Sequence, residues 1–128
     1  AMAGTTSAGA PALVAPVRGV AARSDANFVY YTEGPALRVL TASALPSLAS
    51  TPLDTLTHPG LGIAYDALTE AVYWVEDDTG ATSIHSRPLA VNGTQRTLAT
   101  NQKGANCIAV DDQAVYWLSN GVPYKMPK

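Results

Sequence analysis

The stretch Glu70–Asp78, EAVYWVEDD, decides the fold, because its central triplet Val72-Tyr73-Trp74 recurs at a fixed spacing. VYY stands at residues 29–31 and VYW at residues 115–117, each displaced by 43 residues from the middle triplet. Self-similarity with a period of roughly 20–50 residues is typical of proteins built from stacked structural repeats. We therefore divide the chain into three copies of one unit.

Within the middle copy, short apolar runs rich in Val, Ile, Tyr and Trp alternate with turn-forming residues, which is typical of β-strands. The four strands expected there cover residues 62–66, 71–76, 82–90 and 95–100. Asn92-Gly93, a strong short hairpin signal, stands between the last two. No window carries a sustained helical stripe of apolar residues, so we expect no helix. Four antiparallel strands joined by short turns make one blade of a β-propeller.

The flanking copies follow the same order. The first contributes strands at residues 19–23, 28–33, 36–40 and 53–57, and the third at residues 107–112, 114–119 and 123–128. The third copy stops before its fourth strand, while residues 9–17 resemble a fourth strand that precedes the first copy. We therefore predict an all-β chain whose residues 9–128 form three four-stranded propeller blades in permuted order. Residues 1–8 are expected to be a tag or a disordered leader.

The middle copy, GIAYD…EAVYWVEDD…SIHSRPLAVNGTQRTLA, resembles the YWTD (LDL-receptor class B) repeats and their bacterial relatives, which build six-bladed propellers. The chain departs from that pattern after the aromatic pair, where the family favours Thr-Asp and this sequence has Thr32-Glu33, Val75-Glu76 and Leu118-Ser119. The first copy also has Arg23 where the others have Asp66 and Asp111. The resemblance implies binding of protein or small-molecule partners. It also implies a secreted, surface or periplasmic location in a bacterium, although this chain carries no visible leader.

Three blades are too few to close a ring, since natural propellers have about 4–8. Two copies related by a two-fold axis would give six, so we predict a homodimer closed by strands from both chains. In this scheme Leu13 and Val14 of one copy pair with Tyr124 and Met126 of the other. The competing interpretation is that the chain is a fragment of a longer propeller, co-assembled with its complementary half in a purely structural role.

Composition excludes several partners. The chain has 8 Lys and Arg against 10 Asp and Glu, a net charge of −2, so it has no basic surplus for nucleic acid. Its apolar runs are far shorter than the ~20 residues of a membrane helix, so we expect no membrane insertion. Cys107 is the single cysteine; it excludes an intrachain disulfide and is expected to be a buried, inert thiol.

Candidate site residues fall into two groups. Tyr31, Trp74 and Trp117 occupy equivalent positions, and we expect them in the core between blades rather than stacked on sugars. Glu76, Asp77 and Asp78 are expected to form a solvated acidic loop, and with Asn106 and Asn120 they are the candidate residues for binding a ligand. His58 and His85 have no motif partner, and no catalytic motif is present. We therefore expect a non-catalytic binding or scaffold module without metal or cofactor. A carbohydrate-binding, lectin-like propeller remains the alternative.

Overall fold

A computed structural model describes residues 16–23, 27–41 and 50–128 of the chain. These residues form three antiparallel sheets and no helix, in agreement with the predicted all-β class. The first sheet contains β1 (Val17–Arg23), β2 (Phe28–Glu33), β3 (Ala36–Thr41) and β4 (Ser50–Thr55). The second contains β5 (Gly60–Asp66), β6 (Ala71–Asp77), β7 (Thr82–Pro88) and β8 (Arg96–Ala99). The third contains β9 (Ile108–Val110), β10 (Ala114–Ser119) and β11 (Val122–Pro127).

Apart from the strand expected over residues 9–17, each predicted strand has a counterpart, but some boundaries differ for local reasons. β4 ends at Thr55 rather than Thr57, because the Leu56 N–H donates to Pro35 O (2.8 Å) and its side chain turns into the core. β9 ends at Val110, because the Asp111 carboxylate accepts hydrogen bonds from the Ala114 N–H (2.8 Å) and the N–H one residue earlier and turns the chain. The residues 9–15 assigned to a fourth strand lie outside the described residues, and Val17 begins β1 instead.

The connection between β7 and β8 is a hairpin, but its turn is not the tight Asn-Gly type that the sequence indicated. That type needs positive φ at both central residues, and neither Asn92 nor Gly93 has a positive φ. The Gly93 N–H instead donates to the carbonyl of Ala90, three residues earlier (2.8 Å). Gly93 is required for a different reason, since a Cβ there would lie 2.2 Å from Pro88 O.

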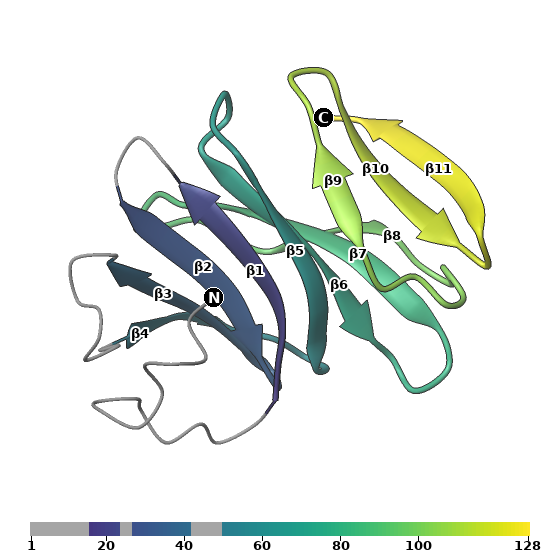
Figure 1. Cartoon of the computed structure of the whole chain (residues 1–128), viewed down its shortest axis with the longest axis horizontal. Coiled ribbons are helices and arrows are strands. Elements are labelled where there is room, and N and C mark those ends of the chain that lie inside the picture. Colours follow the sequence, from purple (N-terminus) through teal and green to yellow (C-terminus); the bar gives the residue numbers. More distant parts are fainter. Residues whose placement is uncertain (1–15, 24–26, 42–49) are drawn as a thin grey trace, which may run out of the picture.

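The inner strands β1, β5 and β9 pack in succession, so the three sheets stand side by side in Figure 1. The contact between them is repeated at glycines. A Cβ on Gly19 would lie 2.3 Å from Leu61 O, and one on Gly62 would lie 2.6 Å from Asn106 O. The Gly62 N–H also donates to Asn106 O (3.0 Å). Backbone therefore meets backbone at this point, which explains why glycine recurs near the start of the first two copies.

The repeat also appears in one hydrogen bond per sheet, which joins the end of the second strand, or the turn just after it, to the segment before the first strand. The donors are spaced 43 residues apart. The three bonds are Gly34 N–H to Pro16 O (3.2 Å), Asp77 N–H to Pro59 O (2.9 Å) and Asn120 N–H to Lys103 O (2.9 Å).

Apolar side chains fill the two spaces between sheets. Tyr30, Ile63 and Trp74 belong to a buried cluster between the first and second sheets, where the rings of Tyr30 and Tyr65 stack 5.7 Å apart. Tyr73, Val75 and the side chains that pack on them form a second cluster between the second and third sheets. Its buried members also include Ile84, Val115 and Trp117. Successive residues of a strand point to opposite faces, so β6 contributes to both clusters and is almost entirely buried.

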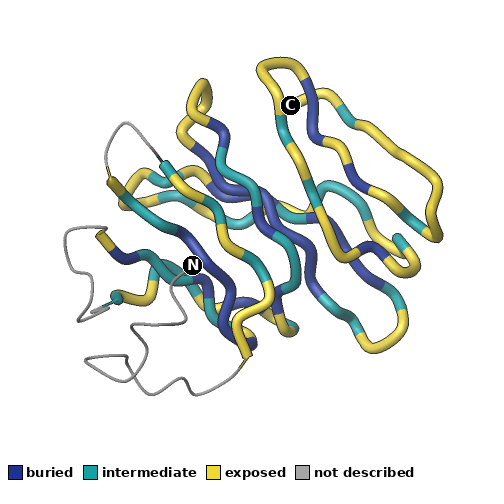
Figure 2. Tube along the Cα trace, in the orientation of Figure 1, coloured by how far each residue is buried: buried dark blue, intermediate teal, exposed yellow. Residues whose placement is uncertain are grey.

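The third sheet is the most exposed part of the described chain, and Figure 2 shows β11 largely in the colour of exposed residues. Strands β3 and β7 each carry an outer strand, whereas β11 has none among the described residues. Cys107 is exposed, which contradicts the buried thiol expected from its apolar neighbours. It occupies the position of Gly19 and Gly62, and within the described chain no further sheet covers it.

The described residues contain no helix with the length and apolarity needed to cross a membrane.

Candidate functional site

The candidate site is centred on Glu76 in β6. This side chain is 1% exposed, so the expectation that it lies in a solvated acidic loop is wrong. It shares the strand face of Trp74, whose indole N–H donates to Glu76 Oε1 (2.9 Å). Glu76 Oε2 accepts the backbone N–H of His58 (3.1 Å). The second sheet thus holds a carboxylate in its interior with both oxygens hydrogen-bonded.

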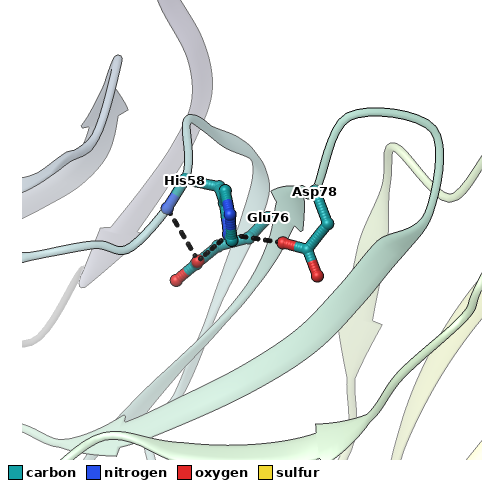
Figure 3. Close-up of side chains that lie close together, drawn as sticks. All are labelled: His58, Glu76 and Asp78. Atoms are coloured by element: carbon teal, nitrogen blue, oxygen red, sulfur yellow. Dashed lines mark hydrogen bonds and ion pairs between the residues drawn. The ribbon is translucent and has the colours of Figure 1, made fainter.

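His58 reaches this carboxylate from the connection between β4 and β5. Its ring Nδ1 lies 2.6 Å from Asp78 Oδ1 and 3.7 Å from Glu76 Oε2. Figure 3 shows the imidazole between the two carboxylates. The three ligand atoms lie within 4.8 Å of one another. We call His58, Glu76 and Asp78 the histidine–carboxylate cluster.

A second layer of side chains orients the cluster. Ser83, at the start of β7, places its hydroxyl 3.3 Å from Asp78 Oδ2 and 2.7 Å from His85 Nε2. The ring of His85 stacks on Trp74 with centroids 5.7 Å apart. Burial lowers the pKa of His85, and this effect outweighs the raising effect of Glu76 and Asp78. At neutral pH His85 is therefore an uncharged imidazole that packs and accepts or donates one hydrogen bond at each nitrogen.

The charge of the cluster is unbalanced. Within residues 16–23, 27–41 and 50–128, neither Glu76 nor Asp78 has a lysine or arginine partner within ion-pair distance. Among the described residues, the ion-pair contacts of these two carboxylates are with the imidazoles of His58 and His85, and burial lowers the pKa of His85. Buried charges in proteins are ordinarily paired or bound to a metal.

The remaining predicted ligand-binding residues lie elsewhere. Asp77 ends β6 beside the cluster, and its backbone N–H donates to Pro59 O. Asn106 and Asn120 lie at the third sheet, where the Asn106 carbonyl meets Gly62 and Asn120 has a positive φ of 49° in the β10–β11 turn. Neither asparagine has a side-chain hydrogen bond to the cluster among the described residues. The residues predicted for one loop site therefore lie in two separate regions, one in the second sheet and one at the third.

The aromatic residues predicted for the core are all buried. Trp74 is 0% and Trp117 5% exposed, each between two sheets. Tyr31 is 6% exposed, but it lies on the flank of the first sheet that faces away from the second sheet, where its hydroxyl donates to Ser50 Oγ (2.8 Å). Buried rings cannot stack on a sugar, so the aromatic positions that suggested a lectin do not form a platform.

The residues predicted to close the ring differ in placement. Leu13 and Val14 lie outside the described residues. Tyr124 is 47% exposed on β11 and stacks on Trp117, and Met126 is partly buried against the cluster between the second and third sheets.

His58 is the residue that sequence reasoning missed. It is separated from Glu76 by 18 residues and from Asp78 by 20, a spacing that matches no local metal or catalytic motif. The one usable signal was that Glu76 shares a strand face with Trp74, which predicts burial of the carboxylate. A buried carboxylate then requires a partner, and His58 is the partner that the fold supplies.

No family model and no curated protein matches the chain. Among solved structures, the chain is similar to one titled as a nidogen/laminin complex, with a TM-score of 0.67 and 16% identity over 87% of this chain and 47% of that one. It is also similar to virginiamycin B lyase from Staphylococcus aureus, with a TM-score of 0.60 and 18% identity over 88% of this chain and 41% of that one. The chain thus spans less than half the length of either structure. At these identities the likeness establishes the fold and not an activity. The three sheets are blades of a β-propeller.

Proposed function

We propose that this chain is a non-catalytic binding or scaffold module that forms half of a six-bladed propeller and closes the ring with a second copy of itself. The observation that carries the proposal is a comparison of three equivalent tyrosines spaced 43 residues apart. Tyr30 and Tyr73 are 4% and 6% exposed, because each faces the following sheet. Tyr116 is 36% exposed, because no sheet follows the third one in the described chain. The flank that carries this tyrosine is covered by the next sheet in the first and second sheets, and it is uncovered in the third.

The surface around Tyr116 is apolar over a continuous area. A shallow groove of about 330 Å³ lies on it, and none of its lining residues is charged. We call this flank the closing surface; its groove is lined by Cys107, Ile108, Ala109, Tyr116, Trp117, Leu118, Pro123 and Tyr124. Exposed apolar flanks of this kind are typical of surfaces that bind another protein.

The first sheet offers the matching surface. Val17 and Val20 are 37% and 61% exposed on the flank of β1 that faces away from the second sheet. In a two-fold dimer, the closing surface of each copy meets this flank of the other, and both contacts form at once. The similar solved structures are about twice as long as this chain, which supports a ring of six blades made by two copies.

Cys107 provides the test. It stands directly before β9 at the position of Gly19 and Gly62, so closure covers it at a contact wide enough for its side chain, while in a single open chain it is exposed. In a two-fold ring the two copies of Cys107 lie at different contacts. Closure therefore protects both thiols without joining them in a disulfide.

The experiment compares the reaction rate of Cys107 with a thiol reagent in the wild type and in Leu118→Arg. Leu118 is 43% exposed in the single chain, so the arginine is accepted by the folded monomer but opposes closure. We expect slow reaction in the wild type and fast reaction in Leu118→Arg. Leu68→Arg is the matched control, because Leu68 is 70% exposed in the β5–β6 turn and away from both flanks. Fast reaction of the wild type at the rate of Leu118→Arg contradicts the proposal.

A further inference from the structure

We propose that the histidine–carboxylate cluster of the second sheet is a binding site for a divalent transition metal ion, with Zn²⁺ the best-fitting cation. The three donors are His58 Nδ1, Glu76 Oε2 and Asp78 Oδ1. This inference is independent of ring closure, since all three residues lie within one chain and away from the closing surface.

Charge is the first reason. The cluster brings two carboxylate groups together, and one of them, that of Glu76, is 1% exposed. A divalent cation offsets the charge of two carboxylates, and it binds an imidazole through the Nδ1 lone pair.

Geometry is the second reason. In a tetrahedral zinc site with bonds of about 2.0–2.2 Å, ligand atoms lie roughly 3.4 Å apart. His58 Nδ1 and Glu76 Oε2 are 3.7 Å apart, close to that separation. His58 Nδ1 and Asp78 Oδ1 are 2.6 Å apart and must separate as the ion enters. Their side chains are 40% and 31% exposed, which leaves them room to turn.

The surrounding hydrogen bonds are the third reason. Metal-binding carboxylates and imidazoles are ordinarily oriented by outer partners. Here Trp74 fixes the free oxygen of Glu76, and Ser83 contacts the free oxygen of Asp78. These hydrogen bonds limit how far the two carboxylates can turn away from the imidazole.

The choice of ion follows from the donors. One imidazole nitrogen with two carboxylates suits a first-row transition ion, whereas Ca²⁺ takes about 6–8 oxygen ligands. Three protein donors are too few for a dedicated calcium site.

Isothermal titration of Zn²⁺ into the chelator-treated chain at pH 7.5 tests the proposal. Every protein carries Cys107→Ser, so that the exposed thiol cannot supply the binding. We expect one ion per chain, and affinity lowered at least about 10-fold in both His58→Gln and Asp78→Asn, because loss of even an outer partner commonly costs 10–100-fold.

The matched control is Asp77→Asn, which removes the adjacent carboxylate outside the cluster and should leave the affinity unchanged. Circular dichroism of the metal-free variants establishes that each is folded. If Asp78→Asn does not fold, His58→Gln alone decides. The proposal is overturned if Zn²⁺ does not bind, if Asp77→Asn weakens binding as much as Asp78→Asn, or if Ca²⁺ binds and Zn²⁺ does not.

Discussion

Asp66 and Lys128 form an ion pair that joins the end of the third sheet to the second sheet. Lys128 Nζ lies 2.6 Å from Asp66 Oδ2, and the two side chains are 8% and 5% exposed. Asp66 also accepts the backbone N–H of Leu68 (3.1 Å) and the hydroxyl of Thr69, so it closes its own turn. This carboxylate therefore connects a local turn with the packing of two sheets.

Replacement of Lys128 by Met should lower the free energy of unfolding by about 3 kcal/mol at pH 7, because it leaves a buried carboxylate without its cation. Urea unfolding measures the loss. Lys125→Met, on an exposed part of β11, is the control and should change stability by less than about 0.5 kcal/mol. Equal losses in the two variants would show that the ion pair contributes nothing specific.

The same pair predicts a pH dependence. Burial raises the pKa of Asp66, but the hydrogen bonds from Lys128, Thr69 and Leu68 outweigh it, and the pKa lies below its usual value of 3.8. The pair's contribution is therefore full above pH 3.8 and is lost as the pH falls through the lower pKa of the folded state. The stability difference between wild type and Lys128→Met should shrink below pH 3.8. A difference that stays constant into that range contradicts this assignment.

The two buried tryptophans can be compared by replacing each of them with phenylalanine. The Trp74 indole N–H donates to the buried carboxylate of Glu76, whereas that of Trp117 donates to Gln102 Oε1 (2.8 Å), a partly exposed amide that water can reach. An unsatisfied buried polar group costs about 1–3 kcal/mol, and more if it is charged. We expect Trp74→Phe to destabilise the protein by at least about 1 kcal/mol more than Trp117→Phe in thermal or urea unfolding. The reverse order would mean that Glu76 is solvated.

The inner-strand glycines give a further prediction. A methyl group on Gly62 would overlap Asn106 O, so Gly62→Ala must separate the second and third sheets and should cost about 1–3 kcal/mol. Cys107→Ala is the control at the equivalent position of the third sheet, because this position already carries a Cβ and the change adds no atom. It should change stability by less than about 0.5 kcal/mol. A small effect of Gly62→Ala would mean that the sheets do not touch through their backbones.

The strands were predictable because each copy repeats a local pattern, and three copies in register remove most ambiguity. The predicted strand ends were wrong where a side chain or a hydrogen bond from another part of the chain ended the strand early. Leu56 turns into the core after β4, and Asp111 binds the backbone after β9. The Asn92-Gly93 turn failed because the carbonyl of Pro88 and the bond to Ala90 set its shape, and neither follows from the dipeptide itself.

The candidate site was predictable only in part. The acidic run 76–78 was found, but its environment was not, because burial of Glu76 depends on Trp74 and on a connector that arrives from the preceding sheet. The packing of that connector places His58 at the site, and no local sequence pattern predicts this packing. Cys107 was misplaced for a related reason, since an apolar run predicts burial only when something covers it.

The central claim is that the third sheet requires a partner, and the mass of the particle in solution tests it most directly. The chain has a mass of 13.3 kDa. Light scattering coupled to size-exclusion chromatography at micromolar concentration should give twice that value for the wild type and the single-chain value for Leu118→Arg. A wild-type chain that is stable and monodisperse at 13.3 kDa would contradict the account.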